Sequence, residues 1–413
     1  MHTHPSHRTA IVLVGCYMML QPLSTDLYVA SLPGLTRTFD VTVATAQLTL
    51  SLFIAAFGAM QLVGGPLADR FGRHPVMLGG LVVYAAASLA CALAPSIDAL
   101  IAARFVQGLG CSTVVVVARA IVRDLYDPLA GARTMALASS LLGLGAIAGP
   151  MIGAALEVRF GFRAAFVLLS CVGVALVATT LWRLRETHHA REHDALRPAR
   201  VARNMGAVLR SRAFVAYTIV GIGTYCGLFA FISGSSFVLI RVLGVPTSRF
   251  GFAFASCVVG YLLGTLACRR LLARRGLARA LATGATCAAI AGALLVALAH
   301  AGVHHWLAIV APVFVFMFAH GIIFPCAQSG AIGPFAQQAG TAAGLFGVLV
   351  MAVAATIGAL IGATHDGTVY PLVWTMAACA AIVVGGVFGL VLRLPAGTPM
   401  RAVPAPTAGS RIR

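Results

Sequence analysis

The chain has 413 residues, of which 60% are hydrophobic and only 10% are charged, and its mean hydropathy is +0.95. A soluble protein of this length carries far more charge, so the composition excludes a water-soluble globular protein. The formal net charge of +18 at pH 7 comes from arginine. No stretch interleaves basic with aromatic residues, so this charge does not indicate a nucleic-acid partner.

Apolar runs long enough to cross a bilayer follow one another along the chain. About 20 apolar residues make one crossing, and a backbone in hydrocarbon satisfies its own polar groups by forming a helix. We therefore predict an all-α membrane protein with twelve transmembrane helices, the first of which is a true span and not a cleaved signal. The predicted spans are 9–31, 43–65, 75–94, 99–120, 134–157, 162–182, 213–236, 249–271, 278–300, 306–328, 340–363 and 370–393.

A polar, arginine-rich segment separates the sixth and seventh runs. LADRFGR at 67–73 recurs weakly as LARRGL at 272–277, which indicates two related halves. We predict a solvated linker, although a DNA- or lipid-binding role for this segment is an alternative. The predicted division is an N-terminal six-helix bundle at 1–182, a cytoplasmic linker at 183–212, a C-terminal six-helix bundle at 213–393 and a disordered cytoplasmic tail at 394–413.

Arginine is distributed unevenly between the two sides of the predicted bundles. With the N-terminus inside the cell, the outer loops hold few of the 29 basic residues, namely Arg37, Arg159, Arg163, Arg241 and Arg249. The positive-inside rule therefore predicts that both termini lie in the cytoplasm.

Asp26 is the one carboxylate that we place well inside a predicted span. A carboxylate in hydrocarbon is costly unless it faces a cavity or a partner, and burial favours its protonated form. These properties suit a proton carrier. The alternative is an interfacial aspartate that caps the end of its helix.

The second and third spans are joined by a short polar hairpin. A tight connection of this kind needs glycine for a positive φ and Pro75 to begin the next helix. The hairpin concentrates charge beside Gly65 and Gly72, and Arg123 at the end of the fourth span is a candidate ion partner for Asp69. Its polar residues are Asp69, Arg70, Arg73 and His74.

Arg104 is the basic residue of the membrane interior. It recurs with Gln107, Gly108 and Cys111 at helical spacing, so these residues share one face of the fourth span. At 1.5 Å per residue, Asp26 and Arg104 both lie roughly 8–10 Å below the outer ends of their helices. We expect them to pair directly or through water. A static structural ion pair is the alternative to a pair that loads and releases a proton.

The fifth span is rich in glycine. Small residues allow close helix contact, and a proline allows a bend. The alternative is that these residues serve only to pack the helix and have no further function. The residues concerned are Gly145, Gly149, Pro150 and Gly153.

Aromatic and soft side chains in several spans predict a cavity for varied apolar ligands. Taken singly, each of them is also compatible with a place in the core or against lipid, and a hydrogen-bonded buried role for His320 is favoured over a proton relay. The predicted cavity residues are Met18, Tyr28, Phe53, Phe57, Gln107, Tyr225, Phe229, Phe231 and His320.

No cofactor or metal is expected. A metal site at His300, His304 and His305 in an outer loop is the alternative, but no carboxylate or cysteine stands beside them in the sequence. A phosphate-binding loop of the G-x-x-x-x-G-K type needs a lysine, which the chain lacks, so the sequence does not favour an ATP-driven pump. We expect a carrier rather than an enzyme.

The hairpin sequence GGPLADRFGRHPVML at 64–78 resembles the G-x-L-a-D-r-x-G-r-k loop of the major facilitator superfamily, with His74 where the family usually has Lys or Arg. LIAARFVQGLG resembles the family's l-x-x-x-R-x-x-q-G-x-g motif, and GLGAIAGPMIG resembles its antiporter motif g-x-x-x-G-P-x-x-G. QLTLSLF, GLFAFISGSSFVLI and PLSTDLYVASLP resemble the Bcr/CflA (bicyclomycin and chloramphenicol resistance) branch of drug–proton antiporters. The last of these departs from the branch at Leu27 and Ala30.

This resemblance implies alternating access across the bacterial inner membrane, with the hairpin as a gating loop that holds the halves closed inside. We therefore predict proton-coupled efflux of small, largely apolar compounds such as drugs, with Asp26 carrying the proton and Arg104 modulating it. The expected partners are the substrate, protons and the lipid bilayer, and we expect a monomer. A metabolite exporter or facilitator for a sugar, nucleoside or amino acid is the nearer alternative, and a membrane enzyme or sensor is the distant one.

Overall fold

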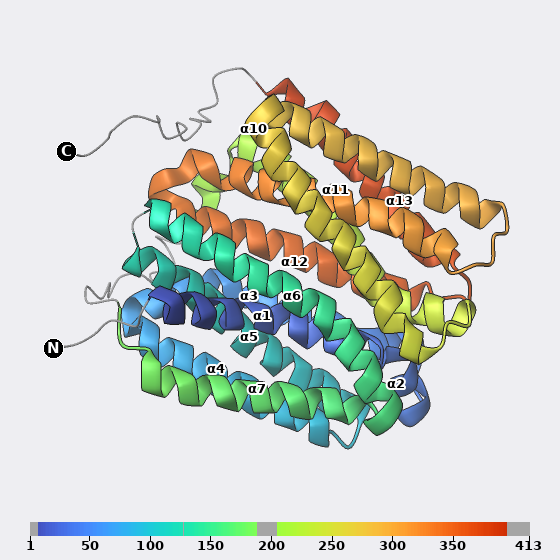
Figure 1. The fold of residues 1–413 in the computed structure, drawn as a ribbon, viewed down its shortest axis with the longest axis horizontal. Helices are drawn as coiled ribbons and strands as arrows, with labels where there is room; N and C mark the ends of the chain where they lie inside the picture. Colours follow the sequence, from blue (N-terminus) through green and yellow to red (C-terminus); the bar gives the residue numbers. More distant parts are fainter. Residues whose placement is uncertain (1–6, 127, 188–204, 395–413) are drawn as a thin grey trace.

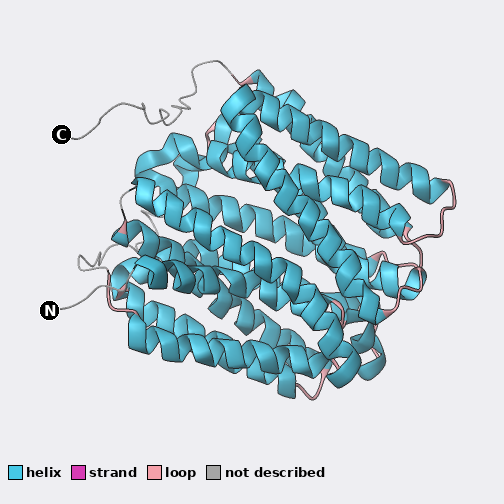
Figure 2. Cartoon of the chain, viewed as in Figure 1, coloured by secondary structure: helices cyan, strands magenta, loops and turns pink. Residues whose placement is uncertain are grey.

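A computed structural model of the chain describes residues 7–126, 128–187 and 205–394. Within these residues every element of regular structure is a helix (Figure 2), which confirms the predicted all-α fold. The predicted linker at 183–212 lies only partly in the described residues. The predicted tail at 394–413 lies outside them except for its first residue.

The first half of the chain forms long helices that run back and forth between the two ends of the molecule (Figure 1). A short helix, α2, which the sequence analysis did not predict, lies in the connection between the first two spans. The helices are α1 (His7–Val29), α2 (Leu32–Thr38), α3 (Val43–Phe71), α4 (Arg73–Leu93), α5 (Ile97–Leu125), α6 (Pro128–Phe160) and α7 (Phe162–Arg183).

The second half repeats this arrangement. The predicted spans at 249–271 and 278–300 appear as one element, α10, whose two legs meet where Gly276 leaves helical geometry at φ 74°. The helices are α9 (Arg212–Ser236) with a π-helical end (Phe237–Val242), α10 (Thr247–His300), α11 (Leu307–Ile332) with a 3₁₀ end (Gly333–Gln338), α12 (Ala339–Ala363) and α13 (Tyr370–Val384), which continues through Gly385–Leu390 to Val391–Arg393.

Each of the twelve predicted spans coincides with one of these helices or with one leg of α10. In the described part of the chain, nine helices are long and apolar enough to cross a membrane, with α10 counted once. We call the end at which α1 begins and α7 ends the near end, which lies on the left of Figure 1. The opposite end, where α1 ends and α3 begins, is the far end.

The two halves pack their helices in the same order. In the first half α1 packs on α6, α3 and α4 pack on α5, and α4 packs on α7. In the second half α9 packs on α12, and α10 packs on both α11 and α13. The halves meet along two seams, α3 with α12 and α6 with α10, which occupy the middle of Figure 1. The fold is therefore two similar six-helix bundles that face each other.

Glycines allow close approach along the α3–α12 seam. A Cβ atom added at Gly58 of α3 would meet the side chain of Met351, and one added at Gly347 of α12 would meet the side chain of Gln61. Nearer the far end, Gly362 of α12 lies against Gln47. Without a hydrophobic driving force between helices in lipid, such small residues are what let two backbones pack closely.

Helix α6 lies between α1 and α10 and uses glycine on the face toward α1. Gly145, Gly149 and Gly153 recur every four residues and so share that face. A Cβ added at Gly145 would meet Met19, one at Gly149 would lie 3.2 Å from the Cβ of Asp26, and one at Gly153 would meet the backbone of Leu27. On its other side, the carbonyl of Pro150 faces Gly251 of α10. The glycines of this helix thus have a packing role in the structure.

Gly153→Ala is expected to lower the free energy of unfolding by about 1–3 kcal/mol, because the new methyl group would press on a helix backbone rather than on a flexible side chain. Gly79→Ala in α4 is the matched control, since a Cβ added there meets nothing within 4 Å. Alanine favours a helix, so the control should be neutral or slightly stabilising. Thermal unfolding of the detergent-purified protein measures both, and equal losses would contradict the packing role.

Candidate functional site

A cavity of about 240 Å³ lies between the two halves. Its wall is formed by α1, α3, α5 and α6 on one side and by α9, α10, α11 and α12 on the other. Most of the lining side chains are aromatic or aliphatic. The polar and charged side chains of the wall are Gln21, Thr25, Asp26, Gln61, Arg119, Tyr225, Tyr261, His320 and Gln328.

The sequence-predicted cavity residues divide into two groups. The cavity is lined by Met18, Phe57, Tyr225, Phe231 and His320. The other four residues do not line the cavity, which differs from the expectation. They are Tyr28, Phe53, Gln107 and Phe229.

Each residue of the second group is occupied elsewhere. Tyr28 and Phe53 pack their rings on Arg104, and Gln107 hydrogen-bonds it. Phe229 is fully buried beside Gly358, at the seam between the halves. These side chains hold helices together, which is why they do not reach the cavity.

Asp26 lies on the cavity wall, in the last turn of α1, which ends at the far end of the molecule. Its side chain is 5% exposed, and Oδ1 accepts a hydrogen bond of 2.8 Å from Thr25 Oγ1. Tyr225, from the opposite half, lies beside Gln21 and close to Asp26. Among the ion pairs of the described residues, none includes Asp26. The structure therefore exposes this carboxylate to the cavity with a single hydroxyl as its side-chain partner.

Arg104 does not form the expected pair with Asp26. Its side chain is fully buried, with Nε donating to the carbonyl of Thr49 at 3.1 Å and Nη1 donating to the carbonyl of Ser24 at 3.2 Å. Nη1 also donates to Oε1 of Gln107 at 2.5 Å. Successive residues turn by about 100° around a helix, so Ser24 and Asp26 lie on nearly opposite faces of α1. Arg104 approaches the face of Ser24, and Asp26 occupies the face toward the cavity.

The rings around Arg104 complete its environment. The guanidinium carbon lies 4.2 Å from the ring centre of Phe53, 5.1 Å from that of Tyr28 and 5.7 Å from that of Phe166. A cation over aromatic faces is stabilised by their negative charge density. The buried charge is therefore solvated by carbonyls and rings that come from α1, α3 and α7.

His320 lies on the cavity wall from the side of α11. Its Nδ1 is 3.0 Å from Thr224 Oγ1, so the imidazole has a hydrogen-bond partner, as the favoured interpretation of this residue requires. The ring also packs against Phe324 and Tyr261, with centres 5.2 and 5.6 Å apart. This histidine contributes an aromatic face to the cavity.

The cavity also contains a residue that the sequence analysis missed. Arg119 of α5 lines the wall and is exposed there. It falls four residues after Val115, which also lines the cavity, so both lie on one face of α5. The position of Arg119 close to the end of a span made it look like a loop charge. Its helical spacing from Val115 was the one feature of the sequence that could have indicated a place on the cavity wall.

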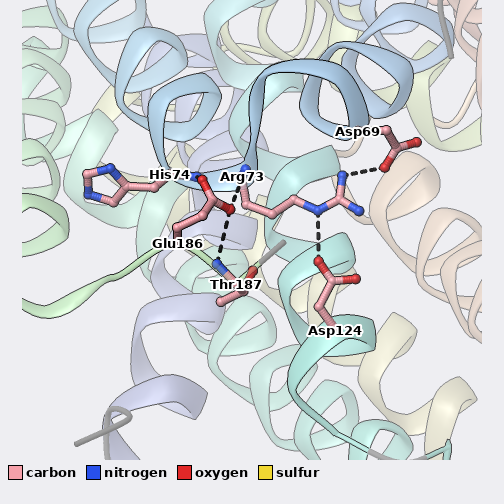
Figure 3. A network of polar contacts seen from close by, with 6 residues as sticks. All are labelled: Asp69, Arg73, His74, Asp124, Glu186 and Thr187. Atoms are coloured by element: carbon pink, nitrogen blue, oxygen red, sulfur yellow. Dashed lines mark hydrogen bonds and ion pairs between the residues drawn. The ribbon is translucent and has the colours of Figure 1, made fainter. Parts of the chain in front are cut away.

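The hairpin between α3 and α4 consists of Gly72 alone, at φ 100°. Figure 3 shows the guanidinium of Arg73 held between two carboxylates. Arg73 Nη1 lies 2.6 Å from Oδ1 of Asp69, and Nε donates to Oδ2 of Asp124 at 2.8 Å. Arg73 is only 2% exposed, so the cation is enclosed by its partners.

Arg123, the expected partner of Asp69, takes part in neither of these ion pairs. Arg73 lies across the Gly72 turn from Asp69 and already occupies its carboxylate. Asp124, the neighbour of Arg123, contributes the second acid. Two other residues of the predicted gating loop have few contacts, since a Cβ added at Gly65 would meet nothing within 4 Å and Arg70 packs over the exposed ring of Phe71.

Glu186, just after α7, is a further loop residue that the sequence analysis missed. Its carboxylate accepts hydrogen bonds from the backbone nitrogens of Arg73 at 2.9 Å and of His74 at 3.2 Å, as Figure 3 shows. It therefore caps the N-terminus of α4, where backbone N–H groups and the helix dipole favour a negative charge. A Cβ atom at Gly72 would collide with this carboxylate. The hairpin thus needs glycine for its φ angle, and a side chain at this position would also displace the capping carboxylate.

At the far end, the halves are joined by polar contacts. Arg241 in the π-helical end of α9 donates to the carbonyl of Pro33 at 2.6 Å and also hydrogen-bonds Thr36 of α2. Gln47 of α3 donates to the carbonyl of Ser233 at 2.6 Å. These contacts cross between the halves at the end of the molecule where α2 lies.

Comparison with family models matches residues 14–359 to the Major Facilitator Superfamily. A bicyclomycin resistance protein homolog of Haemophilus influenzae is 29% identical over 383 residues, which are 93% of this chain and 96% of that protein. A chloramphenicol resistance protein of Pseudomonas aeruginosa is 27% identical, covering 91% of this chain and 89% of its own. Multidrug resistance protein D of Escherichia coli is 29% identical, covering 87% and 89%.

Solved structures agree in fold. The human organic anion transporter MFSD10 superposes with a TM-score of 0.68 at 20% identity, covering 94% of this chain and all of its own. A bacterial homolog of the lysosomal transporter Spinster, in an inward-facing and occupied conformation, superposes with a TM-score of 0.69 at 14% identity and covers 95% of this chain and 97% of its own. Both likenesses extend over nearly the whole chain.

Arg73→Gln is expected to lower the free energy of unfolding by roughly 1.5–3 kcal/mol, because it leaves two carboxylates without their shared cation. Arg70→Gln removes the same charge three residues earlier, where the side chain is exposed, and should change stability by less than about 0.5 kcal/mol. Thermal unfolding in detergent compares the two variants. Equal effects would show that the enclosure of Arg73 is not what stabilises the hairpin.

Proposed function

This chain belongs to the major facilitator superfamily and is a multi-pass membrane transporter, and we propose that it exports small, largely apolar compounds such as drugs in exchange for protons. The observation that carries this proposal is the central cavity, which is lined mainly by aromatic and aliphatic side chains and holds one carboxylate, Asp26. The relatives named for bicyclomycin, chloramphenicol and multidrug resistance support the same cargo class.

The wall of the cavity suits apolar cargo better than sugars. Rings and thioethers from Phe57, Phe231, Phe346 and Met351 offer adaptable contact surface. A sugar carrier needs many hydrogen-bonding side chains to replace the water around the hydroxyls of its substrate. The nearer alternative, a carrier of a sugar, nucleoside or amino acid, is therefore less well supported by this wall. The distant alternative of an enzyme or sensor has no support from the family, whose members are transporters.

Asp26 is the proposed proton carrier. An ionised carboxylate in a largely apolar cavity is costly when, among the described residues, its side-chain partner is one hydroxyl and it forms no ion pair, and binding a proton removes that cost. Access of water from one side or the other then decides whether the proton is taken up or released. Bound cargo lies against the same face of α1, since Met18 and Pro22 line the cavity with Asp26.

Arg104 has a different proposed role from the one that the sequence favoured. It holds the carbonyl of Ser24, two residues from Asp26, and thereby sets the position of α1 relative to α3 and α5. We therefore assign it to positioning the proton carrier, with its influence on the proton transmitted through α1 rather than through an ion pair.

Alternating access would move the half formed by 1–182 against the half formed by 213–393. The near end would face the cytoplasm of a bacterial inner membrane, because arginine is concentrated in the loops at that end. The Arg73 ion pairs stiffen the hairpin there, and the Arg241 contacts close the far end. A monomer contains the whole cavity and suffices for this cycle.

Asp26→Asn is expected to abolish proton release evoked by cargo, because the amide cannot carry the proton. The measurement uses proteoliposomes with an imposed pH gradient, chloramphenicol and a small panel of apolar compounds, and follows proton release on addition of each compound. Loss of the signal by about tenfold or more is expected. Asp40→Asn is the matched control, since Asp40 is exposed in a loop at φ 50°, a conformation that asparagine tolerates.

Two outcomes would contradict this mechanism. Equal proton release by the native chain and Asp26→Asn would remove Asp26 from the proton pathway. Transport that continues without the gradient, equally in both, would make the protein a facilitator. Each proton contributes about 2.3 kcal/mol at 100 mV, so a coupled exporter accumulates cargo against a gradient where a facilitator does not.

A further inference from the structure

Arg119 is a cation on the wall of the cavity. Among the described residues, no ion pair or hydrogen bond involves the side chain of Arg119. The side chain is exposed, and the surface to which it is exposed is the cavity. A cation in a largely apolar wall is costly unless water or a ligand compensates its charge.

Asp26, the carboxylate on the cavity wall, is too far from Arg119 to form an ion pair with it. Arg119 follows Arg104 by 15 residues on α5, which places their backbones about 22 Å apart along the helix. Arg104 reaches the carbonyl of Ser24, so Asp26 lies close to the level of Arg104. Asp26 and Arg119 therefore mark the far and near ends of the cavity.

The direction of the side chain brings the charge into the cavity rather than out of it. Side chains on a helix lean toward its N-terminus, and α5 begins at the far end. The guanidinium of Arg119 therefore leans from the near end toward the middle of the molecule. Two amide side chains also line this part of the wall, Gln61 of α3 and Gln328 of α11. Each lies in the half of its helix that is closer to the near end of the molecule.

We propose that Arg119 is an anion-binding group of the cavity and that the cargo includes amphipathic acids, with an apolar body and a carboxylate or similar anionic group at one end. This inference rests on the proposed function, because it takes the cavity as the cargo site. The planar guanidinium donates paired hydrogen bonds that match a carboxylate, and the amides of Gln61 and Gln328 add neutral donors. The aromatic wall beyond them accepts the apolar body of the ligand.

The competing explanation is that Arg119 is only one of the basic residues that set the orientation of the chain in the membrane. The two explanations differ in what they predict for ligands. A topological charge does not distinguish an acid from its neutral analogue in binding. An anion-binding group does, and it loses the distinction when its charge is removed.

The test measures equilibrium dialysis of 2-naphthylacetate and its neutral amide, 2-naphthylacetamide, against the full chain purified in detergent. We expect the native protein to bind the acid more tightly, and Arg119→Gln to reduce the ratio of the two affinities by about tenfold to a hundredfold. Binding of the amide should stay within about twofold. Arg119→Lys, which keeps the positive charge, should retain part of the ratio.

Arg274→Gln is the control for a general effect of surface charge, because Arg274 is exposed on α10 near Gly276 and does not line the cavity. An unchanged ratio in Arg119→Gln, or an equal fall in Arg274→Gln, would overturn the inference. Dialysis needs no pH gradient, so the result is independent of proton coupling. If the amide binds but the ratio is insensitive to Arg119, the inference alone fails, whereas absence of binding by both compounds also counts against the cavity as the cargo site.

Discussion

The guanidinium of Arg104 has no access to solvent, and its hydrogen bonds to the carbonyls of Ser24 and Thr49 join three helices of the first half. A buried charge is tolerated only where polar groups replace water around it. Here the replacements come from the backbones of α1 and α3, and from aromatic rings that close the remaining sides. Once α1 is held in this way, its opposite face, with Asp26, is directed toward the second half.

The same constraint separates the charges of the cavity. Asp26 and Arg119 lie at opposite ends of one largely apolar space, so neither neutralises the other. If the two charges were paired directly, each would be held in its ionised form and would bind a proton or a ligand only weakly. In the proposed cycle, separated charges stay available: Asp26 is neutralised by a proton, and Arg119 by an anionic group of the cargo. The wall between them then selects for an apolar body.

In the proposed alternating access, movement between the halves has to break contacts at one end while the other end stays closed. At the far end these contacts are a few hydrogen bonds from Arg241 and Gln47, which are readily exchanged for bonds to water. Along the α3–α12 seam, side chains of one helix pack against glycines of the other, which lets the two helices lie close together. The hairpin of Gly72 and Arg73, by contrast, is rigid, because its ion pairs and the cap from Glu186 lie within one half.

The sequence by itself determined the positions of the long helices, because a bilayer admits only long apolar helices and each apolar run is visible in the sequence. It did not indicate the short helix α2. It also identified Asp26 and Arg73, since charges in or beside hydrocarbon are rare and therefore conspicuous. Tertiary structure alone decided which partners these charges have. Arg104 bonds carbonyls rather than Asp26, and Asp69 pairs with Arg73 rather than Arg123. Glu186 and Arg119 acquire their places only when distant helices meet. Helix spacing defines which face a residue occupies, but what stands opposite that face depends on packing between elements far apart in the chain.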